Sequence, residues 1–174
     1  MTIYMVQHVF SRPRWELDWN AWYADNLKIL LSVPGFRTGQ RFKALTGTPP
    51  RYMAIYTVDS PAVFKSKRYA DAGGGGSNSA QFRPAYQVWI RNLFEGMERA
   101  AEVGDDQYLL SIDSADKSET VAEVTLTWLE ATGFHKSTLY RGIGVIESDQ
   151  LEAVRSHASD ALYQPITAQQ GQRY

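Results

Sequence analysis

The chain has 174 residues, a formal net charge of −1 at pH 7 and no cysteine. Because 44% of the residues are hydrophobic and 13% are aromatic, the chain can bury a sizeable core, which excludes wholesale disorder. The balanced charge argues against nucleic acid or an anionic membrane as a partner, and the lack of cysteine excludes disulfides, thiolate metal sites and Cys nucleophiles. No long apolar run and no secretory leader is visible, so we expect a cytoplasmic protein without a membrane partner.

The first half of the chain predicts alternating strands and helices. Residues 2–10 predict a strand with two largely apolar faces, so this strand should lie between two layers. Residues 15–33 predict an amphipathic helix, which Pro34 ends. Residues 36–43 and 52–58 predict two strands of a hairpin, since a turn rich in glycine and proline separates them.

A helix over residues 61–69 and a strand over residues 85–95 complete this half, and Pro61 stands at the first helical position. Residues 73–79 (GGGGSNS) lie between the two elements. They predict a mobile loop, because four consecutive glycines lose much conformational entropy when they become ordered. The glycine run itself, residues 73–76, is either a lid over a pocket or inert.

The pattern restarts in the second half. Residues 107–114 predict a strand, residues 118–131 a helix and residues 135–142 another strand. A helix should follow within residues 145–156, and a poorly marked final strand lies near residues 163–169.

The order β-α-β-β-α-β in residues 2–95 predicts an α+β protein with the ferredoxin-like fold. Gly133-Phe134 before a strand echoes Gly35-Phe36, which indicates a degenerate internal repeat, with chance similarity as the alternative. We therefore expect two ferredoxin-like units, residues 1–100 and a shortened unit of residues 107–174. They should pack as one compact domain, a tandem, pseudo-dimeric α+β barrel.

A single ferredoxin-like sheet has helices on one face and leaves the other face bare. We expect the bare face to carry apolar side chains that need burial, namely Val6, His8, Phe10, Tyr56 and Trp89. The second unit should cover this face, with the pocket between the two sheets. A homodimer contact should close the remaining strand edges.

Four short features of residues 19–42 follow the order typical of one superfamily. They are an aromatic pair, an acidic residue, a PGF turn and an Arg-aromatic pair, here Trp22-Tyr23, Asp25, Pro34-Gly35-Phe36 and Arg41-Phe42. With these features the first hundred residues resemble the dimeric α+β barrel superfamily, most closely its EthD-like branch. Asn26 stands where that branch has a histidine, which removes the usual candidate acid/base. Members include cofactor-free monooxygenases, lactone isomerases, polyketide cyclases and haem enzymes, so the resemblance predicts the fold and leaves the reaction open.

His8 is the candidate catalytic residue among three histidines. In the middle of an apolar strand, a neutral imidazole that faces a cavity can act as a general base. The alternative is a core histidine bonded to a carbonyl or a tyrosine. His135 is a candidate for the pocket rim, and His157 is expected in solvent. No cluster has metal-ligand spacing, so we expect no metal and no cofactor, with haem held by a histidine as the alternative.

Arginines on predicted strands form a second group of candidates, because a buried charge needs a partner or a ligand. We expect Arg41 and Tyr56 to stabilise an oxyanion and Arg91 to bind a carboxylate or enolate. An internal ion pair or an exposed strand end is the alternative. The other candidates for substrate binding are mostly aromatic: Tyr4, Trp22, Tyr23, Asn26, Trp89, His135 and Tyr140.

These candidates lead to three hypotheses of function. The first is a cofactor-independent enzyme of the lyase, isomerase or cyclase type. It would act on a small aromatic or polyketide-like molecule bound inside the barrel, with His8 as acid/base. The second is a non-catalytic small-molecule-binding or stress protein of the same fold. The third is a cofactor-free monooxygenase or a haem-binding protein.

Overall fold

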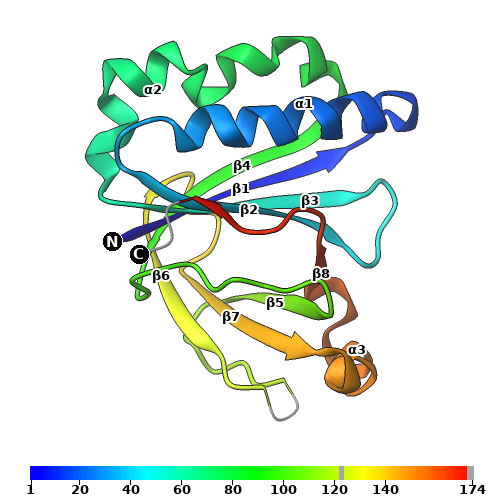
Figure 1. Cartoon of the computed structure of the whole chain (residues 1–174). Helices are drawn as coiled ribbons and strands as arrows, with labels where there is room; N and C mark the ends of the chain where they lie inside the picture. Colours follow the sequence, from blue (N-terminus) through cyan, green and yellow to red (C-terminus); the bar gives the residue numbers. More distant parts are fainter. Residues whose placement is uncertain (122–123, 172–174) are drawn as a thin grey trace.

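The computed structural model describes residues 1–121 and 124–171 (Figure 1). Its strands are β1 (Thr2–Phe10), β2 (Phe36–Ala44), β3 (Arg51–Val58), β4 (Tyr86–Glu95), β5 (Gln107–Ser114), β6 (Thr127–Phe134), β7 (Tyr140–Glu147), β8 (Leu162–Pro165) and β9 (Gln170–Gly171). Its helices are α1 (Pro13–Leu31), α2 (Lys67–Asp71) and α3 (Leu151–Ala158), with 3₁₀ segments η1 (Pro61–Lys65), η2 (Gly74–Ala85), η3 (Ser148–Gln150) and η4 (Ser159–Ala161). Over these ranges, no helix is both long and apolar enough to span a membrane.

Within the described residues, eight strands form a closed antiparallel β-barrel. The order around the barrel is β3, β1, β4, β6, β7, β5, β8 and β2, and the pairing of β2 with β3 closes the ring. The pairings are antiparallel throughout. The short β9 adds a pairing with β2 at Thr38 and Gly39. Closure gives each of the eight strands two neighbours, so the edges of an open sheet are avoided.

This architecture shows that the predicted ferredoxin-like fold class is wrong. Two βαββαβ units would form two open sheets packed face to face, whereas strands from both halves here belong to one closed sheet. The joints are the pairings of β4 with β6 and of β2 with β8. The predicted elements of the first half are present, including the β2–β3 hairpin, but they close onto the second half. The division into units at residues 100 and 107 and the homodimer stay predictions.

The helix predicted at residues 118–131 is wrong over its described residues. Residues 122 and 123 lie outside the described part, and the chain from Thr127 onwards forms β6. Leu129 and Ala131 are buried while Glu130 between them is exposed, which is the period of a strand. The strand predicted at 135–142 lies further along, in β7, and the final predicted strand is split between β8 and β9.

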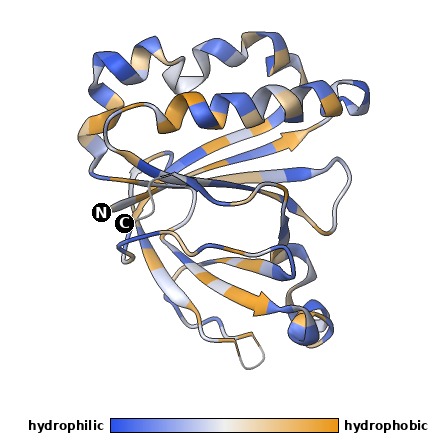
Figure 2. Ribbon diagram, in the orientation of Figure 1, coloured by the Kyte–Doolittle hydropathy of each residue, from blue (hydrophilic) through white to orange (hydrophobic). Residues whose placement is uncertain are grey.

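Strand β1 lies between two cores because its residues alternate between two apolar faces. Figure 2 shows the strand between the helices on one side and the second half of the chain on the other. Ile3 and Met5 point into the barrel, where side chains from all eight strands meet. Tyr4, Val6 and Phe10 point outwards, into a second core beneath α1 and the segment that contains α2. In Figure 1 these helices lie together over one side of β1, β3 and β4.

The layer that covers each face is the reverse of the prediction. The sequence predicts that the face with Val6, His8 and Tyr56 meets the second half of the chain, with a pocket between two sheets. In the structure, α1 covers this face. The second half closes over Ile3 and Met5 on the opposite face. Alternation predicts which residues share a face, but it does not specify which layer packs against that face.

Leu129 tests the contribution of β6 to the barrel core. It is 0% exposed, whereas Leu17 on α1 is 81% exposed. We expect Leu129→Ala to lower the free energy of unfolding by about 3 kcal/mol, because it leaves a cavity in the barrel. The control Leu17→Ala should change it by less than about 0.5 kcal/mol. Urea denaturation measures both, and equal effects would contradict the placement of β6 in the core.

Candidate active site

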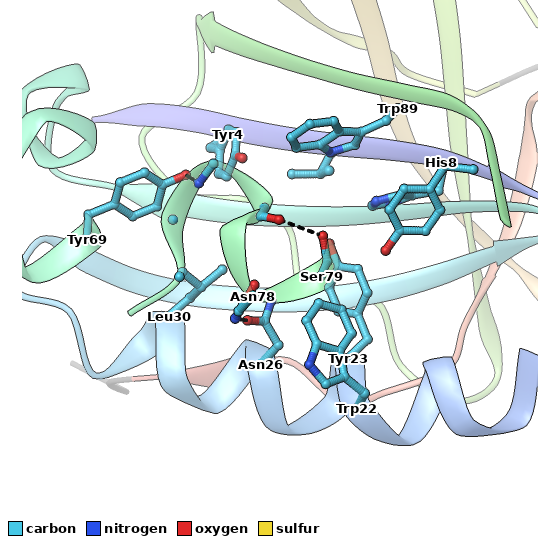
Figure 3. A pocket seen from close by; sticks show the side chains of 16 residues that line it. Tyr4, His8, Trp22, Tyr23, Asn26, Leu30, Tyr69, Asn78, Ser79 and Trp89 are labelled. Carbon is cyan, nitrogen blue, oxygen red and sulfur yellow. Dashed lines mark hydrogen bonds between the residues drawn. The ribbon is translucent and has the colours of Figure 1, made fainter. Parts of the chain in front are cut away.

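A cavity of about 40 Å³ lies between α1, residues 69–79 and the outward face of β1 and β4 (Figure 3). Its lining is mostly aromatic and contains no acidic or basic residue other than histidine: Tyr4, Val6, His8, Trp22, Tyr23, Asn26, Leu30, Tyr69, Gly73, Gly74, Gly75, Gly76, Asn78, Ser79, Tyr86 and Trp89. A space of this size holds one or two water molecules.

His8 is only 5% exposed and sits among aromatic rings. Its ring centre lies 4.7 Å from that of Tyr86, 5.4 Å from that of Trp19 and 5.7 Å from that of Tyr23. Within the described part of the chain, no hydrogen bond joins its imidazole to another residue. Buried polar groups normally have a partner, so the imidazole has bonding capacity left for a ligand in the cavity.

The imidazole of His8 is neutral at physiological pH. Burial lowers its pKa to about 3, and the nearby positive charge of Arg41 acts in the same direction. A neutral imidazole has one nitrogen that donates and one that accepts. His8 can therefore accept a proton, but only where a new negative charge forms beside the resulting imidazolium.

Arg41 supplies a buried positive charge below the cavity and is 2% exposed. Its Nη2 donates to the side-chain oxygen of Asn20 at 2.8 Å, and its Nη1 donates to the Asn20 carbonyl at 3.3 Å. The guanidinium lies 4.1 Å from the ring centre of Tyr23 and 5.1 Å from that of Trp19. No carboxylate in the described residues pairs with it, so neutral groups alone stabilise this cation.

Tyr23 and Tyr56 are buried near Arg41. Burial raises the pKa of both phenols, and the charge of Arg41 opposes part of the rise. The Tyr56 hydroxyl is buried without a hydrogen-bond partner in the described structure. Its ring packs on Gly39, where a Cβ would come within 2.9 Å. Tyr23 lines the cavity, whereas Arg41 and Tyr56 lie behind its wall.

The glycine run forms one wall of the cavity. Asn78 donates to the side-chain oxygen of Asn26 at 2.7 Å, and the Gly75 N–H donates to the Tyr69 hydroxyl at 3.0 Å (Figure 3). Gly76 has a φ of +79°, and a Cβ there would lie 2.9 Å from the Trp89 ring. Close packing against Trp89 therefore explains why a glycine is needed at residue 76. The mobility of the run stays a prediction.

The structure brings most of the predicted binding residues together. Tyr4, Trp22, Tyr23, Asn26 and Trp89 all line the cavity beside His8.

Three predicted binding residues lie outside the lining. Arg91 is adjacent to it, His135 is exposed and bonds through Nδ1 to the backbone of Arg91, and Tyr140 lies on β7 next to Lys117. The lining residues that were not predicted include Tyr69, Tyr86, Asn78 and Ser79. Asn78 and Ser79 follow the glycine run within three residues, so a lid extended to residue 79 would have included them.

A larger recess of about 450 Å³ is lined by residues of β1, β3, β5, β7 and β8 together with residues 119–121 and 157–161. Two of its arginines have internal partners. Arg141 donates to Asp113 at 2.7 and 3.0 Å, and Arg51 donates to the Asp160 carbonyl at 2.7 Å. The described residues contain no group of three His, Asp or Glu that could hold a metal ion.

No protein-family model matches the chain, and no curated protein matches it. Solved structures do match. An anthrone oxidase-like protein has a TM-score of 0.60 at 10% identity, over 98% of this chain and 92% of that chain. A candidate monooxygenase from Fusobacterium nucleatum subsp. nucleatum has a TM-score of 0.63 at 10% identity, over 99% and 96%. Another, from Lactobacillus acidophilus, has a TM-score of 0.51 at 10% identity, over 90% and 80%.

At such low identity the likeness concerns the fold alone. The likeness leaves the resemblance to the dimeric α+β barrel superfamily a prediction from the sequence. It does not distinguish the EthD-like branch, which stays a prediction.

The buried neutral imidazole predicts a pH dependence of stability. His8 has a lower pKa in the folded state, so the unfolded state takes up the extra proton as the pH falls below 6.5. The contribution of the neutral His8 imidazole to the free energy of unfolding is complete above pH 6.5 and is lost as the pH falls towards 3. From about pH 6 to about pH 4, we expect the free energy of unfolding of the wild type to fall by about 1.4 kcal/mol per pH unit relative to His8→Gln. Urea denaturation at each pH measures this difference, and parallel curves would contradict it.

Proposed function

We propose that the cavity binds a small planar aromatic molecule and that His8 removes a proton from it, as a cofactor-independent enzyme would. The observation that carries the proposal is a buried, neutral histidine with no hydrogen-bond partner in the described protein, placed in the wall of an aromatic-lined cavity. Trp22, Trp89 and Tyr86 offer ring faces against which a flat ligand can pack.

Binding requires the cavity to enlarge. Its volume of about 40 Å³ is far below the ~300 Å³ at the lower end of typical ligand pockets. Residues 73–79 are the part of the wall proposed to move. Opening would break the hydrogen bonds from Asn78 to Asn26 and from Gly75 to Tyr69, which tie this segment to α1 and α2. Opening of this segment would expose His8 and Trp89 to a ligand, and closure would exclude water.

The reaction class that we favour is oxidation by O₂ without a cofactor. Two of the similar structures are candidate monooxygenases and one is an anthrone oxidase-like protein. In a molecule of the anthrone type, a CH₂ group between two aryl rings gives a proton to His8, and the delocalised carbanion passes an electron to O₂. The superoxide so formed combines with that carbon and takes the proton back from His8, which gives a hydroperoxide that loses water. CH₂ and O₂ thus become C=O and H₂O. Isomerisation and cyclisation begin with the same proton transfer and are the alternatives.

Arg41 would assist the proton transfer without touching the substrate. Its charge weakens His8 as a base in the empty cavity, but it also stabilises negative charge that forms on the substrate. When the carbanion and the imidazolium form together, their attraction offsets the cost of burying each charge.

Anthrone is a direct probe of this proposal. We expect the wild-type protein to accelerate O₂ uptake and ketone formation above the spontaneous rate. His8→Gln should lower the enzymatic rate by roughly 10²–10³-fold, the usual contribution of a general base. Because the pKa of His8 in the free protein is about 3, kcat/KM should not decline near pH 6.5. The control His157→Gln alters an exposed histidine on α3 and should leave the rate unchanged.

An unchanged rate in His8→Gln would contradict proton transfer to this residue. Binding of anthrone to the wild type without acceleration would overturn the enzyme proposal and support the non-catalytic binding protein.

A further inference from the structure

Arg91 of β4 is a cation without an anionic partner at the side of the cavity. Within the described residues its guanidinium forms no hydrogen bond and no ion pair, and its Nε is fully buried. The group lies 4.9 Å from the ring centre of Trp89 and 4.6 Å from that of Phe134. The two aromatic rings hold the guanidinium in place, but they do not accept hydrogen bonds along its N–H directions as an oxygen would.

From this geometry we infer that Arg91 binds a carboxylate of the ligand, which makes that ligand an aromatic carboxylate. The inference rests on the proposed function of the cavity.

Arg91 and His8 face the same side of the sheet. In the antiparallel register of β1 with β4, His8 is opposite Trp89 and Val6 is opposite Arg91. Opposite residues share a face, and residues two apart on a strand are about 7 Å apart. A ring packed against Trp89 would therefore lie close to both the imidazole and the guanidinium. The ligand would carry its carboxylate about one aromatic ring away from the carbon that loses the proton.

Gly75, which has no side chain, lies beside the guanidinium. The position that a Cβ of Gly75 would take lies 3.7 Å from Nη1 of Arg91, so a side chain there would occupy the approach. The Gly75 N–H is already bonded to the Tyr69 hydroxyl at 3.0 Å, which holds this turn in place.

The surrounding charges favour a carboxylate over a neutral or cationic group. The cavity lining contains no acidic residue. A second cation, Arg83, lies 5.8 Å from the Trp89 ring centre and donates to the Gly76 carbonyl at 3.1 Å. A planar guanidinium with free adjacent N–H groups matches the two oxygens of a carboxylate, which can accept both bonds at once.

Two probes of the same shape isolate the charge: 2-naphthoate and the neutral 2-naphthamide. By isothermal titration calorimetry, we expect the wild type to bind 2-naphthoate at least tenfold more tightly. Arg91→Gln should remove this preference and leave the affinity for 2-naphthamide unchanged. Arg91→Lys keeps the charge but loses the planar guanidinium with its paired N–H groups, so it should show an intermediate preference. This variant replaces Arg91→Gln as the test if the Gln variant does not fold. The control Arg12→Gln removes an exposed arginine that lies 5.5 Å from the Trp15 ring centre, and it should preserve the preference.

Equal affinities of the wild type for the two probes, failure of both to bind, or a preference that survives Arg91→Gln would each overturn the inference. The measurement involves no chemical step, so its result is separate from the test of His8. A carboxylate preference retained in His8→Gln would support Arg91 even if proton transfer fails.

Discussion

The burial of both faces of β1 is the constraint on which the rest of the structure depends. Its side chains alternate, so Ile3 and Met5 need an apolar layer on one side, while Tyr4 and Phe10 need one on the other. The barrel interior provides the first layer, and α1 with the α2 region provides the second. His8 shares the outward face, so it lies between the sheet and the helices and not inside the barrel.

Two arginines give this layer its electrostatic character: Arg41, which is buried, and Arg91, which is half-buried. Arg41 lies behind the wall next to His8, and Arg91 lies beside Trp89. Neither has a carboxylate partner in the described residues, and aromatic side chains surround both, so their fields are little screened. Both arginines would therefore favour negative charge on the ligand. Arg41 would favour it at the reacting carbon, and Arg91 would favour it at a substituent about one ring away. Keeping these cations unpaired costs stability, which fits a site built for an anionic ligand.

Local patterns in the sequence predicted much of the first half but little of how the halves join. The helical period up to Pro34 and the two strands after it were sufficient for α1 and the β2–β3 hairpin. The second-half helix failed because Val121, Val124 and Trp128 fit a helical period, while Leu129 and Ala131 fit a strand whose partners lie far away in sequence. Similarly, aromatic composition pointed to four lining residues, Tyr4, Trp22, Tyr23 and Trp89. The contribution of Tyr69 and Tyr86 depends on how the α2 region and β4 approach the cavity in the folded chain. The sequence also suggested Arg41 as an oxyanion-stabilising residue, but it could not show that this side chain lies behind the cavity wall.

A crystal structure of the protein with anthraquinone-2-carboxylate tests the central claim most directly, because it locates the ligand. The account predicts the ring system against Trp89, one ring carbonyl within hydrogen-bond distance of His8, the carboxylate on Arg91, and residues 73–79 displaced from their position here. A ligand bound instead in the recess beside Arg141 and Tyr163, with the cavity at His8 unchanged, would contradict it.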